Sequence, residues 1–159
     1  MAIVDLLGKW FWLLFIGVTF LNGAIYKSRA RTHVERNPDL AEGYERIARG
    51  FVVWTSLPWI VMGIGCTVGG VPSVLHYFNP RGGNLYVLAF YASLFLLWIL
   101  GSYWILFQDG AMMLVKHPGL LNPDIKNPLI VKLLWVACVL GGIVAFVMMY
   151  AGIIPAPDA

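Results

Sequence analysis

Charged side chains are scarce in this sequence. Only 12% of its 159 residues are Asp, Glu, Lys or Arg, whereas 60% are hydrophobic. Soluble domains carry roughly 25% charged residues, and a soluble fold of this length would have to hide more apolar surface than one core holds. A bilayer accepts apolar side chains at the protein surface, so the composition predicts a single integral membrane domain over residues 1–159.

Cysteine is also scarce, and two thiols, Cys66 and Cys138, are too few for a disulfide framework. Their expected depths in the membrane differ by roughly 9 Å at ~1.5 Å per helical residue, which exceeds the ~7 Å limit for a bridge. Both cysteines are therefore predicted to be small packing residues.

Motifs that fix a reaction are missing. The sequence has no GxSxG elbow, no GxxxxGK[ST] phosphate loop, no HExxH and no CxxC. None of the three histidines, His33, His76 and His117, falls within an expected span, which excludes a haem held by two histidines at mid-membrane. The sequence therefore predicts no catalytic residue, cofactor or metal, and it favours a protein that is not an enzyme.

Four long apolar runs are present, over about residues 3–26, 51–71, 85–107 and 129–154. A spanning helix needs ~20 mainly apolar residues, because each adds ~1.5 Å across a ~30 Å hydrocarbon core. The runs are continuous rather than alternating, which indicates helices rather than barrel strands. The predicted fold class is all-α, an integral membrane bundle of four transmembrane helices.

Basic residues predict the orientation. Six of the eleven Lys and Arg lie in the first loop, 27–50, and Lys116 and Lys126 lie in the third loop, 108–128. Because basic loops stay in the cytoplasm, both are expected there, with both termini outside. Asp5 lies at the start of the first run and the basic residues Lys27, Arg29 and Arg31 follow the run, an order that favours a retained span over a cleaved signal peptide. The expected location is a bacterial plasma membrane.

Asn-Pro pairs predict helix starts at Asn37-Pro38 and Asn127-Pro128, each an N-cap followed by proline at the first helical position. The first helix is expected to continue past the membrane into the cytoplasm, and one helix, which also begins in the cytoplasm, is expected over 38–71. An Asn-Pro-Asp triplet occurs at 37–39 and again at 122–124. Two interpretations remain open: two parallel helical-hairpin repeats with loops built alike, or a coincidence of common turn residues.

Ionisable residues deep in the hydrocarbon, which are typical of transporters, are nearly absent. Asp109 and Lys132 lie near the cytoplasmic ends of neighbouring spans, where an ion pair between them or simple snorkelling is expected. They are also the only ion-coupling candidates for a homo-oligomeric small-solute transporter or channel. His33 and His117 lie in the two cytoplasmic loops, either solvated or as the site of a membrane-interface enzyme.

Small residues are spaced for close helix packing. Gly65 and Gly69 in the second span, and Gly141 and Ala145 in the fourth, have small-xxx-small spacing. Such faces serve contacts within the bundle or with a partner. The leading hypothesis is therefore a non-catalytic accessory or assembly subunit of a membrane complex. Its expected partners are membrane lipid and another membrane protein or a second copy, and not nucleic acid.

Overall fold

The computed structural model describes residues 2–119 and 125–153, with side chains from residue 7 onward. Four long helices dominate it: α1 (Ala2–Arg36), α2 (Ala41–Thr67), α3 (Leu85–Phe107) and α5 (Pro128–Ala151). All four are long and apolar enough to cross a membrane, and the described ranges contain no strand. The all-α prediction with four spans is confirmed.

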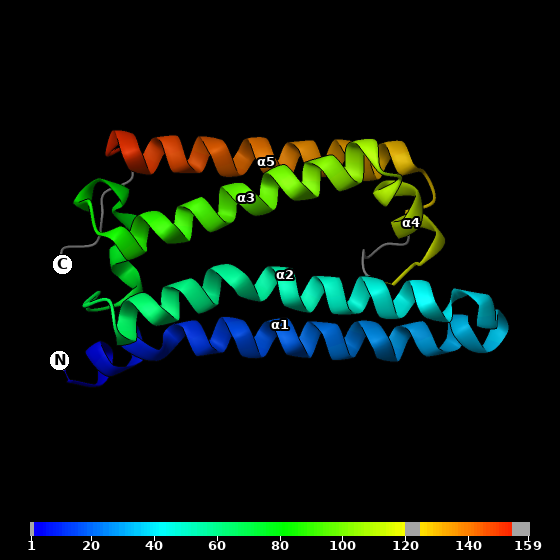
Figure 1. The fold of residues 1–159 in the computed structure, drawn as a ribbon, viewed down its shortest axis with the longest axis horizontal. Coiled ribbons are helices and arrows are strands. Elements are labelled where there is room, and N and C mark those ends of the chain that lie inside the picture. The colour runs from blue at the N-terminus through cyan, green and yellow to red at the C-terminus, as the bar shows by residue number, and fades with distance from the viewer. Residues whose placement is uncertain (1, 120–124, 154–159) are drawn as a thin grey trace.

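The long helices lie side by side in chain order (Figure 1). α1 packs against α2, α2 against α3, and α3 against α5. α1 and α5 therefore form the two edges of a row. α1 and α3 run in one direction and α2 and α5 in the other (Figure 1). The first hairpin, α1 with α2, and the second hairpin, α3 with α5, therefore have the same orientation.

We call the end of the molecule that carries residues 27–50 the basic end. There α1 continues to Arg36, ten residues beyond the apolar run, and the 3-10 helix η1 (Pro38–Leu40) turns the chain into α2. The Asn37 side chain accepts a hydrogen bond from the Asp39 backbone N–H at 3.3 Å, as the Asn-Pro pair predicted.

The second hairpin turns differently at the basic end. α3 ends at Phe107, and Asp109 takes a left-handed conformation with φ 57°, after which the short helix α4 (Gly110–Lys116) begins. α1 extends ten residues beyond its apolar run, whereas α3 ends with its apolar run at Phe107. The described parts of loops 27–50 and 108–128 are therefore not built alike. The second Asn-Pro-Asp triplet, 122–124, lies outside the described residues. At Asn127 the predicted cap is present, accepting from the Leu129 N–H at 2.9 Å.

The opposite end of the molecule is closed by the 3-10 helices η2 (Val74–Phe78) and η3 (Pro80–Gly82). α2 ends at Thr67 rather than at residue 71, and Gly70 then takes φ 68°, which glycine adopts without steric cost. Buried side chains gather in three clusters near the two ends of the molecule. Many large apolar side chains on the helices are exposed, as a lipid-facing surface allows.

Candidate functional sites

The two histidines of the basic loops meet at Tyr44. The Tyr44 ring stacks with His33 at 6.1 Å between ring centroids and meets His117 edge-on at 4.9 Å. His117 is buried, and its Nδ1 lies 2.7 Å from the Met113 carbonyl oxygen. A carbonyl only accepts hydrogen bonds, so Nδ1 carries a proton. The structure thus brings both candidate histidines to one tyrosine.

This cluster joins the two hairpins. Hydroxyl groups of the first hairpin donate to backbone carbonyls of the second: Tyr44 to Pro118 at 3.2 Å and Tyr26 to His117 at 3.5 Å. Gly43 lets α2 approach the imidazole, because a Cβ there would collide with the His117 ring. These contacts give His117 a packing role at the joint. Among the described residues, no group of three or more His, Cys, Asp or Glu is placed to hold a metal.

Asp109 and Lys132 do not pair in the structure. The Lys132 ammonium donates to the Leu106 carbonyl at 3.1 Å, and Asp109 is exposed. The two ion pairs of the described residues both involve Glu45 instead, with Lys27 at 3.0 Å and Arg49 at 3.7 Å. The physical reason is local: the last turn of a helix leaves carbonyl oxygens without intrahelical partners, and Lys132 reaches one of them.

Gly65 and Gly69 are covered within the chain. A Cβ on Gly65 would collide with the Tyr77 hydroxyl, and one on Gly69 with the Tyr86 ring. The Tyr77 hydroxyl also donates to the Met62 carbonyl at 3.1 Å. This small-residue face therefore packs the 68–84 segment and α3 onto α2 and is not open to a partner.

Gly141 and Ala145 lie on an open surface. A Cβ on Gly141 would meet nothing within 4 Å, and Ala145 is exposed. Their neighbours on the same side of α5 are also exposed. We define the outer face of α5 as Leu134, Ala137, Gly141, Val144 and Ala145.

Two tryptophans join α3 to α5, a feature that the sequence analysis missed. The Trp98 ring of α3 takes the space beside Gly142 of α5, and the Trp135 ring of α5 takes the space beside Gly101 of α3. The Trp135 Nε1 also donates to the Ser102 hydroxyl at 2.9 Å. A Trp and a Gly three or seven positions apart on one helix face were the available signal.

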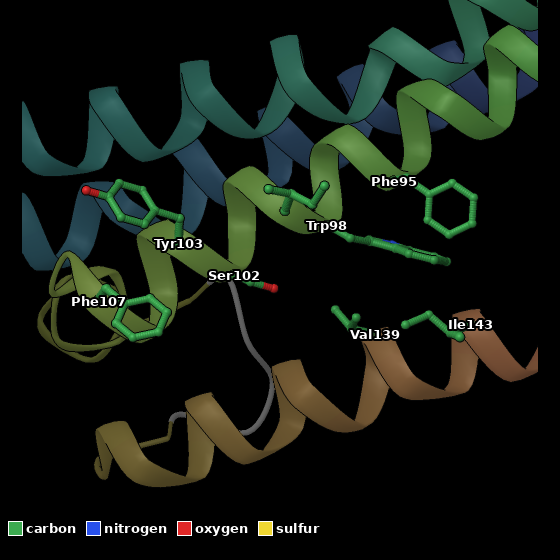
Figure 2. A pocket seen from close by; sticks show the side chains of 8 residues that line it. Phe95, Trp98, Ser102, Tyr103, Phe107, Val139 and Ile143 are labelled. Atoms are coloured by element: carbon green, nitrogen blue, oxygen red, sulfur yellow. The ribbon is translucent and has the colours of Figure 1, made fainter.

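A groove of about 400 Å³ lies between α3 and α5, in the size range of small-molecule sites, ~300–1,000 Å³. In Figure 2, Trp98 projects into the space between the two helices, and Val139 and Ile143 face it from α5. We call this the α3/α5 groove, and its lining is Phe95, Trp98, Ile99, Ser102, Tyr103, Phe107, Val139 and Ile143.

Comparison with protein-family models, with curated proteins and with solved structures gives no match to this chain.

Proposed function

We propose that this chain is a non-catalytic accessory or assembly subunit that packs against another membrane protein through the outer face of α5. It resides in a bacterial plasma membrane with the basic end in the cytoplasm, where Lys and Arg of short loops are retained. The exposed Gly141 and Ala145 carry the proposal, because they are a small-xxx-small pair that no described residue of this chain covers.

The position of α5 supports this role. It is an edge helix of the row, and Val131 is the one residue buried among its described positions. Lipid tails are as apolar as leucine, so close backbone approach at small residues, rather than hydrophobicity, favours helix association in membranes. Gly65, Gly69 and Gly142 are each covered by an aromatic side chain of this chain, whereas Gly141 is left open.

The test is purification of tagged protein from its native membrane in mild detergent, with mass determination of whatever co-elutes. The wild type is expected to elute with a second membrane protein. The Gly141→Leu/Ala145→Leu variant is expected to lose that protein, because the larger side chains keep the backbones apart.

A matched control carries the same changes elsewhere. Gly17 of α1 has nothing within 4 Å of its Cβ position, and Ala92 of α3 is exposed. The Gly17→Leu/Ala92→Leu variant should therefore keep the partner. A wild type that elutes alone or only with its own copies would overturn the accessory role. A partner retained by both variants would overturn the assignment of the face.

A further inference from the structure

We infer that the α3/α5 groove holds one acyl chain of an anionic phospholipid, with the lipid headgroup at the Lys132 ammonium. This goes beyond the proposed function and does not depend on it. Positions two residues apart differ by about 200° around a helix. Val139 and Ile143, which line the groove, therefore lie on the opposite side of α5 from Gly141.

The length of the groove fits one leaflet. Its lining on α3 runs from Phe95 to Phe107, about 18 Å at ~1.5 Å of rise per residue. One leaflet is half of the ~30 Å hydrocarbon core. Phe107 is the last residue of α3 at the basic end, so the groove extends inward from that side of the membrane.

Two tryptophans keep α3 and α5 apart along the groove. Because the Trp98 and Trp135 rings take the space beside Gly142 and Gly101, α3 and α5 cannot close onto each other. The Ser102 hydroxyl, one of the polar groups of the lining, already accepts a hydrogen bond from the Trp135 Nε1–H. A lining of this kind offers contact area and few free polar groups, which suits a hydrocarbon chain better than a polar ligand.

A positive charge stands at the mouth of the groove. Lys132 lies seven residues before Val139 and eleven before Ile143, so the three share one face of α5. Its ammonium has three N–H donors, and the Leu106 carbonyl beside Phe107 is bonded to it at 3.1 Å. In the described residues Lys132 makes no ion pair. The remaining donors and the charge complement an anionic headgroup.

The test uses delipidated protein in detergent and native mass spectrometry with two lipids that carry the same acyl chains, phosphatidylglycerol and phosphatidylcholine. The wild type should retain one phosphatidylglycerol in preference to phosphatidylcholine. Lys132→Met should weaken phosphatidylglycerol retention about tenfold, because it removes a hydrogen bond to a charged group and the free energy of such a bond corresponds to about a tenfold change in affinity. Lys132→Arg should preserve it. Lys126→Met, at an exposed lysine just before α5, is the matched control and should have no effect.

A second pair of variants tests the groove itself. Val139→Trp should fill the groove and abolish retention of the lipid, whereas Val144→Trp, on the outer face of α5, should not. Equal retention of the two lipids, or a Lys132→Met variant that behaves as wild type, overturns the headgroup assignment. Undiminished lipid retention by the Val139→Trp variant overturns the assignment of the lipid to the groove. Gly141→Leu should leave lipid retention unchanged. The test of lipid binding in the groove is therefore independent of the test of partner binding on the outer face of α5.

Discussion

The indole of Trp135 occupies the space that a side chain at Gly101 would need. The reverse contact, Trp98 beside Gly142, lies farther along the same two helices. A large ring on each helix thus meets a glycine on the other. These two contacts fix the register of α3 against α5 and set the distance between them, because neither ring can move toward the opposite backbone.

The first prediction concerns Gly101. Replacing Gly101 by Ala places a Cβ against the Trp135 ring and should lower the free energy of unfolding by about 1–3 kcal/mol, as overpacking does. Reversible unfolding in mixed micelles measures the change. Gly141→Ala, at a position with nothing nearby, should leave the free energy of unfolding unchanged or raise it. Equal effects of the two substitutions would contradict the tight contact.

The hydrogen bond between Trp135 and Ser102 gives a second prediction. A double-mutant cycle with Trp135→Phe and Ser102→Ala should show a coupling energy of about 0.6 kcal/mol, and no more than about 1.7 kcal/mol, the range of polar contacts between membrane helices. The same unfolding assay measures it. Strict additivity of the two substitutions would show that the 2.9 Å contact contributes nothing to stability.

A third prediction concerns the joint between the hairpins. Gly43→Ala would force the His117 ring away from α2. The backbone N–H of His117, bonded to the Met113 carbonyl at 3.1 Å, should then exchange faster with deuterium. Hydrogen exchange measured by mass spectrometry over residues 110–119 tests this. Gly17→Ala in α1 is the control, and equal exchange in both variants would remove the packing role of Gly43.

Orientation is the subject of the fourth prediction. In a Cys66→Ser/Cys138→Ser background, a cysteine placed at the exposed Glu42 should react with a membrane-impermeant maleimide only after the cells are broken. A cysteine at the exposed Asn79, at the other end of the molecule, should react in intact cells. The opposite pattern would place the basic end outside and reverse the topology expected from the loop charges.

The helices were largely predictable, because length and hydropathy decide which segments can cross a bilayer. The third span has the predicted limits, 85–107, and both asparagines of the Asn-Pro pairs accept the predicted capping hydrogen bonds. Asn37, however, caps the 3-10 helix η1, and α2 begins only at Ala41. The extension of the first helix beyond its apolar run was expected, and α1 ends at Arg36, directly before the Asn37-Pro38 pair. Hydropathy falls after Tyr26, but Tyr26 and Ala30 still pack in a buried cluster against α2, and tertiary contacts of this kind leave only a weak hydropathy signal.

The contacts between helices were less predictable. Spacing alone identified Gly65 and Gly141 as packing residues, yet one is covered by Tyr77 and the other is open. Which face of a helix meets its own neighbours depends on how the helix is rotated about its axis. A span that is apolar on all sides has no amphipathic pattern from which this rotation could be predicted. In the same way, the charges of Asp109 and Lys132 predicted either an ion pair or snorkelling, whereas the Leu106 carbonyl accepts a hydrogen bond from the ammonium.

The single row of helices has a consequence for how copies and neighbours combine. A row has two free edges, α1 and α5, and they lie on opposite sides of the molecule (Figure 1). A protein that docks on α5 leaves α1 untouched, so a second neighbour can be added there without remodelling the first contact. If proteins occupy both edges, the width of the row in the membrane plane sets how far apart they are held.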